Sequence, residues 1–261
     1  MAEVVVVSDQ EAAGDLAAHI ILDTIRRRPE AVLGLATGST PLSTYRRLAQ
    51  QVKERSLDVS HVRGFALDEY VGLPHDHPES YRSVITRDVV VPVGLNPSQI
   101  HVPDGALAGI EHAGADYEGS IADAGGIDVQ LLGIGTDGHI GFNEPGSSFA
   151  SLTRVKTLSE QTRRDNARFF DDQDDVPMHC ITQGLATILR AGHLVLLAFG
   201  EGKAEALAGA VEGPVSASNP GSAIQLHPRV TVIADEAAAS ALRHVEYYRY
   251  AYAHKPSWQG F

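Results

Sequence analysis

Residues 128–145 read DVQLLGIGTDGHIGFNEP, and this stretch decides the fold that the sequence predicts. Its first part, residues 129–134, has the length and composition of a buried strand. A glycine-rich loop follows, and it carries three titratable side chains, Asp137, His139 and Glu144. Ligands of open α/β sheets bind beyond the carboxyl ends of the strands, so chemistry is expected in this loop. A surface turn with a solvated histidine is the alternative explanation.

Strand-like apolar runs alternate with helical patterns along the chain. We expect strands at residues 4–7, 31–36, 64–67, 129–134, 193–199 and 230–234. We expect helices at residues 11–28, 42–53, 111–122, 161–170, 178–190, 203–211 and 235–247. This alternation predicts an α/β fold with a mostly parallel sheet and helices on both faces, in one domain over residues 1–261.

Composition excludes several classes of function. The net charge of −12 argues against nucleic-acid binding, and an anionic ligand would need a local cluster of cations and backbone N–H groups. Cys180 is the only cysteine, so no intrachain disulfide is possible, which fits a reducing cytoplasm. We see no secretory signal and no apolar run near the roughly 20 residues that span a bilayer, and therefore expect no membrane partner.

Three features outside the central loop could bind anions. The turn at residues 37–41, TGSTP, offers N–H groups and hydroxyls, although an ordinary helix cap would explain it equally well. Lys203 begins a predicted helix, against the preference of the helix dipole, and an anion bound beside it would explain this placement. Arg154 and Lys156 share a face if residues 147–158 are extended, although a solvated edge strand is the usual reason for such a pattern.

Two acidic residues, Asp68 and Glu69, follow the predicted strand at residues 64–67. Side chains alternate across a strand, so only one of the two can point into a cleft between neighbouring loops. A solvated turn is the alternative.

The sequence resembles the glucosamine-6-phosphate deaminases nearly from end to end. The resemblance rests on LGLATGSTP at residues 33–41, LDEYVGL with HPESY at 67–81, GIGTDGHIGFNEPGSS at 133–148, TRVKTL at 153–158, NARFF at 166–170 and QLHP at 225–228. It implies a modified Rossmann-like fold and an enzyme that converts D-glucosamine 6-phosphate and water to D-fructose 6-phosphate and ammonia, in amino-sugar catabolism.

The resemblance also implies roles for individual residues. Asp68 is the base that moves a proton between C2 and C1 of the sugar. His139 helps to open the pyranose ring, oriented by Asp137 and Glu144. The substrate phosphate is bound by Gly38, Ser39, Thr40, Arg168 and Lys203. A carboxylate can shuttle a proton between adjacent carbons, and an imidazole suits proton transfer near neutral pH, so no metal and no other cofactor is expected.

One branch of the family is an allosteric hexamer activated by N-acetylglucosamine 6-phosphate. Its effector site lies between subunits and matches Ser147, Arg154, Lys156 and Thr157 here. We therefore expect a homo-oligomer, with a hexamer as one form, in the cytoplasm. The tail at residues 248–261 and the loop at residues 215–223 depart from the pattern of that branch.

Two other functions are alternatives. The related 6-phosphogluconolactonases share the strand and the G-x-G-x-D-G-H motif but lack the glutamate of FNEP. A sugar-phosphate sensor of a transcription regulator would need a separate basic DNA-binding module, for which the sheet pattern leaves no room.

Overall fold

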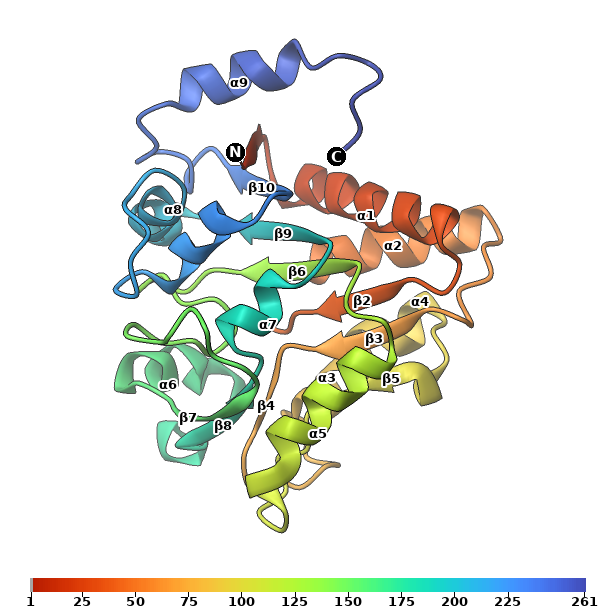
Figure 1. The fold of residues 1–261 in the computed structure, drawn as a ribbon, viewed down its shortest axis with the longest axis vertical. Helices are drawn as coiled ribbons and strands as arrows, with labels where there is room; N and C mark the ends of the chain where they lie inside the picture. The colour runs from red at the N-terminus through yellow and green to blue at the C-terminus, as the bar shows by residue number, and fades with distance from the viewer. Residues whose placement is uncertain (1) are drawn as a thin grey trace.

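Seven parallel strands form the main sheet of the computed structural model, which describes residues 2–261 (Figure 1). Their order is β1-β10-β9-β6-β2-β3-β5, and every pair of neighbours is parallel. The strands are β1 Glu3–Val7, β2 Val32–Leu35, β3 Arg63–Ala66, β5 Ile100–His101, β6 Val129–Gly133, β9 His193–Ala198 and β10 Val230–Asp235. The predicted α/β class is confirmed, although the two-residue strand β5 was not expected.

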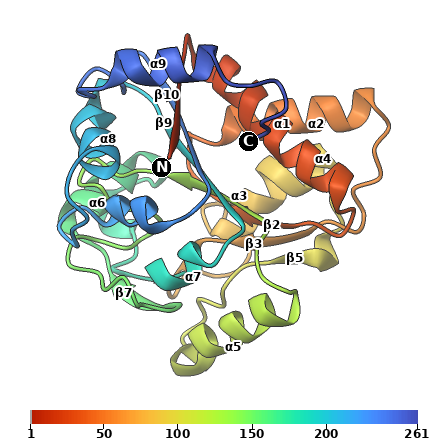
Figure 2. The same cartoon turned by 45° about the horizontal axis from the view of Figure 1, so that its top comes forward.

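Helices cover both faces of this sheet. The helices of the described residues are α1 Gln10–Arg27, α2 Leu42–Glu54, α3 Tyr81–Ile85, α4 Val91–Val93, α5 Ile110–Asp123, α6 Glu160–Asn166, α7 Leu185–Leu189, α8 Ala204–Val211 and α9 Val245–Ala253. Of these, α3 and α6 lie beside the second sheet described below and not on the main one. Figure 2 shows α1, α2 and α4 on one side of the sheet and α5 and α7 on the other. Among residues 2–261, no helix is long and apolar enough to cross a bilayer.

Local chemistry sets the bounds of α1. The Asp9 carboxylate accepts a hydrogen bond from the backbone N–H of Ala12 at the first turn, and Arg26 and Arg27 lie in the last turn. A carboxylate at the N-terminus and cations at the C-terminus both suit the helix dipole. The strands behind this helix are apolar on both faces, as in β9, where all six residues are buried.

The strands β2 and β6 are parallel neighbours, and between them the order in which the chain adds strands to the sheet changes direction. From β2 the chain continues to β3 on one side, whereas β6 is followed in the main sheet by β9 on the other side. The loops after β2 and β6 therefore separate at the carboxyl ends of the strands, in the middle of the sheet, and this is the crevice in which ligands of such folds bind. These are the loops of residues 37–41 and 134–146.

A second, smaller sheet was not expected. It is antiparallel, in the order β4-β8-β7, and consists of β4 Asp68–Tyr70, β8 His179–Thr182 and β7 Arg154–Thr157. The prediction of one helix over residues 178–190 was wrong, because the first part forms β8 and only α7 is helical. Hydrogen bonds to β4 and β7 outweigh the helical pattern of this apolar segment. Residues 154–157 are extended and β7 lies at an edge of this sheet, as the edge-strand alternative held, but Arg154 and Lys156 are partly buried and not fully solvated.

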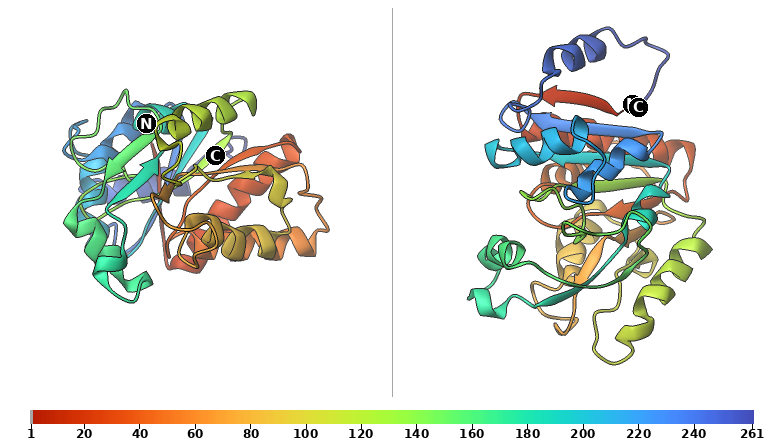
Figure 3. Two further views of the ribbon diagram at one scale, coloured as in Figure 1. Left: turned by 90° about the horizontal axis from the view of Figure 1, so that it is seen from below. Right: turned by 60° about the vertical axis from the view of Figure 1, so that its left-hand side comes forward.

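The prediction of a last helix over residues 235–247 was also wrong, because α9 begins ten residues later. The Asp235 carboxylate accepts hydrogen bonds from the N–H groups of Gly200 and Ala238 and holds the chain in a turn. The Glu212 carboxylate accepts from the N–H groups of Arg243 and His244, at the start of α9. Helix α9 then runs along β1, at the opposite end of the molecule from the small sheet (Figure 3).

A buried histidine makes the stability of the main sheet sensitive to pH. His193 is 1% exposed, and its Nε2 lies 2.9 Å from the hydroxyl oxygen of Thr231. Burial lowers the pKa of His193 to about 4, and the nearby charges of Arg229, His227 and Lys255 add to this effect. The imidazole is therefore neutral in the folded protein over most of the acidic range.

We expect the free energy of unfolding to fall as the pH drops from about 6.5 to 4, because the unfolded chain binds a proton that folded His193 does not. The expected loss is roughly 2 kcal/mol. Urea denaturation at several pH values measures it. His193→Gln should flatten this part of the profile, while substitution of the exposed His112 by Gln should leave it unchanged. An unchanged slope in His193→Gln would contradict the account.

Candidate active site

The loop after β6 folds back so that the imidazole of His139 covers its own strand end. The backbone N–H of Gly135 donates to the carbonyl oxygen of His139 over 2.8 Å. A Cβ atom on residue 135 would lie 2.2 Å from the ring of His139, so only glycine fits beneath the imidazole. The ring is thereby fixed at the carboxyl end of the strand next to β2.

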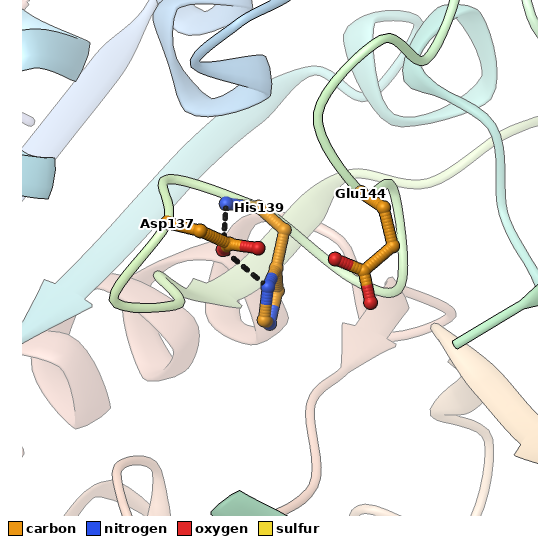
Figure 4. Close-up of side chains that lie close together, drawn as sticks. All are labelled: Asp137, His139 and Glu144. Atoms are coloured by element: carbon orange, nitrogen blue, oxygen red, sulfur yellow. Dashed lines mark hydrogen bonds and ion pairs between the residues drawn. The ribbon is translucent and has the colours of Figure 1, made fainter. Parts of the chain in front are cut away.

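Two carboxylates flank this imidazole (Figure 4). Asp137 Oδ1 lies 2.6 Å from His139 Nδ1 and also accepts from the backbone N–H of His139 over 3.1 Å. This close contact is not a linear hydrogen bond, because the ring N–H does not point straight at the oxygen. Glu144 faces the imidazole from the other side, with Oε2 buried and without a hydrogen-bond partner.

The other carboxylate oxygen of Glu144 is firmly held. Oε1 accepts from the backbone N–H of Ser159 over 3.0 Å and from the hydroxyl of Thr162 over 2.7 Å. Glu144 is thus fixed from the N-terminus of α6, which leaves Oε2 free to face His139.

The charge state of Asp137 favours one form of the imidazole. Burial acts to raise the pKa of Asp137, but the contacts with His139 and its charge lower it below its ordinary value. An ionised Asp137 stabilises a proton on Nδ1 of His139 and leaves Nε2 available for proton exchange with a ligand. Asp137, His139 and Glu144 each offer one ligand atom within 4.8 Å of the others, so they could also hold a metal ion.

The adjacent acids Asp68 and Glu69 have separate roles. The carboxylate of Glu69 accepts hydrogen bonds from the backbone N–H groups of Tyr70, Tyr81 and Arg82, so it fixes the first turn of α3. Asp68, which is 5% exposed, points the other way. Burial raises the pKa of Asp68 to about 8, helped by the charge of Glu69 and opposed by a hydrogen bond with Thr182.

Asp68 lies beside the loop that carries His139. A Cβ atom on Gly141 would be 3.6 Å from Asp68 Oδ2 and 3.1 Å from the hydroxyl oxygen of Thr182. The same hydroxyl accepts from the backbone N–H of Phe142 over 3.1 Å. The small sheet therefore brings a buried carboxyl to a loop that belongs to the main sheet.

The residues expected to bind the phosphate come from three separate elements. Gly38, Ser39 and Thr40 form the turn after β2, and Thr40 lies next to Gly133 at the end of β6. Lys203 ends a short 3₁₀ turn, Glu201–Lys203, before α8. Burial lowers the pKa of Lys203, and the charges that act on it include those of Asp165, Arg168 and Asp137. These charges from separate elements thus lie near one another.

Of the four residues matched to an effector site, two contact the loop that carries His139 and two do not. The hydroxyl of buried Ser147 donates to the carbonyl oxygen of Glu144 over 2.7 Å, and Arg154 donates to Asn143 Oδ1 over 2.8 Å. Both contacts reach the loop of residues 134–146, called the His139 loop below. Lys156 and Thr157 lie further along β7, where Thr157 is exposed.

Sequence reasoning missed several residues that hold this loop. Thr182 lay in the segment predicted to be helical, so nothing pointed to it. The loop at residues 215–223 packs on both ends of the His139 loop: Gly221 donates to the carbonyl oxygen of Gly138 over 2.7 Å, and Gly146 donates to that of Ala217 over 2.8 Å. The sequence of residues 215–223 departs from the family pattern, which marked this loop as unusual. Nothing in the sequence indicated that it contacts the loop that carries His139.

Asp68→Asn should stabilise the fold near neutral pH. The folded-state pKa of Asp68 is about 8, above the ordinary value of 3.8, so wild-type stability is lost as the pH rises through this window. We expect the variant to gain at least about 1 kcal/mol at pH 7–8, with the difference closing near pH 4. Denaturant titration measures it. Exposed Asp58→Asn is the control, and an Asp68→Asn variant no more stable than wild type at pH 8 would refute the burial argument.

Known proteins match this chain over most of its length. The family described as glucosamine-6-phosphate isomerases/6-phosphogluconolactonase matches residues 8–233. The chain is 61% identical to a glucosamine-6-phosphate deaminase of Bifidobacterium longum strain DJO10A, over 100% of both chains. It is 58% identical to the deaminase of Streptomyces coelicolor, over 99% of both.

Solved structures give the same picture of the fold. A structure described as a monomeric glucosamine-6-phosphate deaminase superposes with a TM-score of 0.89 at 43% identity, over 92% of this chain and 99% of the other. A 6-phosphogluconolactonase of Trypanosoma brucei superposes with a TM-score of 0.77 at 20% identity, over 93% and 99%. The second likeness concerns the fold alone.

Proposed function

The chain belongs to the glucosamine-6-phosphate isomerase/6-phosphogluconolactonase family, and we propose that its crevice converts D-glucosamine 6-phosphate and water to D-fructose 6-phosphate and ammonia. The reaction is an aldose–ketose isomerisation coupled to loss of the amine. One observation carries the assignment of the site: the buried carboxyl of Asp68 lies beside the loop that holds His139 between two carboxylates.

In this proposal His139 acts first, on the closed sugar ring. Its Nε2 moves a proton from the O1 hydroxyl to the ring oxygen O5, so that the C1–O5 bond breaks and an aldehyde forms at C1. Asp137 keeps the imidazole in the required tautomer and orientation. Glu144, with one oxygen held and the other facing the ring, stabilises positive charge on the imidazole as the proton passes through it.

Asp68 then carries out the isomerisation. Its carboxylate takes the proton from C2, and O1 gains the proton that the ammonium group of the substrate loses, which gives a neutral enolamine. The carboxylic acid of Asp68 then returns its proton to C1 and becomes a carboxylate again. The product is a protonated imine at C2, to which water adds, and ammonia leaves with the excess proton as ammonium to give the ketone of fructose 6-phosphate. Each step moves protons between groups in the crevice and does not call for a metal or another cofactor.

The raised pKa of Asp68 fits a base of this kind. A carboxyl with a pKa of about 8 is a stronger base than an ordinary aspartate when ionised, and it can hold the proton between the two transfers. The substrate phosphate would be held by the turn at Gly38, Ser39 and Thr40 and by Arg168 and Lys203. Arg168 and Lys203 supply local positive charge for the phosphate in a chain whose net charge of −12 would otherwise repel an anion.

Asp68→Asn should lower kcat by about 10²–10⁴-fold, because the amide cannot accept the C2 proton. Binding of glucosamine 6-phosphate should survive, since the phosphate ligands are untouched. Ammonia release measures the first effect and calorimetric titration the second. Turnover like that of the wild type would sink the assignment of the base. Assay of 6-phosphogluconolactone hydrolysis on the same samples separates this function from that of a lactonase.

The effector, the oligomeric state and the location are further parts of the proposal. We propose that N-acetylglucosamine 6-phosphate binds at Ser147, Arg154, Lys156 and Thr157, and that the protein acts as a homo-oligomer, with a hexamer as one form, in the cytoplasm. The contacts of Ser147 and Arg154 with the His139 loop support a regulatory role. The buried free thiol of Cys180 suits a reducing compartment.

N-acetylglucosamine 6-phosphate should lower the substrate concentration at half-maximal rate by a few-fold, an effect typical of allosteric coupling. Rate curves with increasing effector measure the shift, and light scattering of the same samples gives the subunit number. Arg154→Gln should abolish the shift. Superimposable curves for the wild type would show that the site does not regulate this enzyme.

A further inference from the structure

The small sheet aligns three polar side chains in one row. In its register Asp68 of β4 lies opposite Thr182 of β8, and Thr182 lies opposite Arg154 of β7. Directly opposed residues in antiparallel strands point to the same face. Segment 141–143 of the His139 loop covers this face, since Gly141 lies beside Asp68, Phe142 beside Thr182 and Asn143 beside Arg154.

Thr182 occupies the middle of this row and is fully buried. Its hydroxyl oxygen accepts from the backbone N–H of Phe142 over 3.1 Å. In the structure this hydroxyl donates to the carbonyl oxygen of Gln183, with 3.4 Å between the two oxygens, and the Asp68 carboxyl on the opposite strand is its other acceptor. An ionised carboxylate is the stronger acceptor of the two, so the hydrogen turns to Asp68 when Asp68 carries its charge.

We propose that Thr182 is a positioning residue that joins the base to the His139 loop, by accepting from the Phe142 N–H and donating to the ionised carboxylate of Asp68. The inference rests on the proposed role of Asp68. Two hydrogen bonds in series polarise one another. The bond from the Phe142 N–H to Thr182 therefore strengthens the bond from Thr182 to Asp68, and together they stabilise the charge on Asp68. The hydroxyl also keeps the carboxylate from turning away from the loop.

Other titratable and charged groups around Asp68 do not replace this contact. The charge that acts on Asp68 is that of Glu69, and the charge of Asp68 in turn acts on Tyr70, Tyr81, Tyr117 and Cys180. Arg82 of α3 acts on Tyr117, and Glu144 of the His139 loop, Arg154 and Lys156 of β7 act on Cys180. Burial raises the pKa values of the three tyrosines and of the cysteine, so these groups are neutral at pH 7. Glu69 carries like charge and opposes ionisation.

The test compares Thr182→Val with Thr182→Ser. Valine keeps the shape and loses the hydroxyl, whereas serine keeps the hydroxyl and loses a methyl group. In Thr182→Val the ionised form of Asp68 loses one donor, so the acidic limb of the kcat/KM profile for glucosamine 6-phosphate should move up by about one pH unit. The rate should fall about tenfold below the limb and much less above it. Thr182→Ser should restore the wild-type limb.

Thr187→Val is the matched control. Thr187 is also buried, and its hydroxyl donates to a carboxylate, that of Glu118, at a distance from the crevice. This variant should lose stability without any shift of the pH profile. Thr182→Ala, which also removes the hydroxyl, provides the same comparison if the valine variant does not fold.

The outcomes separate this inference from the function on which it rests. An unshifted limb in Thr182→Val, with the same loss of rate at every pH, would show that Thr182 only supports the fold and would overturn the proposal. Persistent activity in Asp68→Asn would instead remove Asp68 as the base, whatever Thr182 does. A shifted limb restored by serine supports the positioning role.

Discussion

A carboxyl group that is 5% exposed costs folding free energy whenever it is ionised, and Asp68 is held in this position between the small sheet and the His139 loop. Burial raises its pKa to about 8, which makes it a better base once it has lost its proton. The residues around Asp68 reduce this cost. Strand β8 brings the hydroxyl of Thr182 opposite Asp68, and Glu69 is turned away to hold the first turn of α3.

The topology of the main sheet explains why this carboxyl meets an imidazole. Strands β2 and β6 are parallel neighbours, but the strand that follows β2 is added on one side of the pair and the strand that follows β6 on the other. Their loops therefore separate in the middle of the sheet, where such folds form a ligand-binding crevice. The loop after β6 holds His139 between Asp137 and Glu144, and the turn after β2 offers backbone N–H groups to an anion. Lys203, before α8, adds positive charge in a chain that is acidic overall.

Features that depend on a pattern in neighbouring residues could be predicted from the sequence. The strand β6 and its glycine-rich loop are marked by a local pattern, as is the alternation that gives the parallel sheet. The antiparallel sheet could not be predicted, because the apolar pattern of residues 178–190 suits a helix as well as a strand, and only pairing with distant β4 and β7 decides between them. Thr182 was missed for this reason. The roles of Asp68, His139 and the phosphate ligands stay predictions, although the structure brings the loops that carry them to one crevice.

A crystal structure of the Asp68→Asn variant with glucosamine 6-phosphate tests the central claim most directly. The account predicts the phosphate between the turn at residues 38–40 and Lys203, with C1 and C2 of the sugar beside the amide of residue 68 and its ring oxygen within hydrogen-bond distance of His139. A sugar bound elsewhere, or bound here with C1 and C2 out of contact with residue 68, would contradict it.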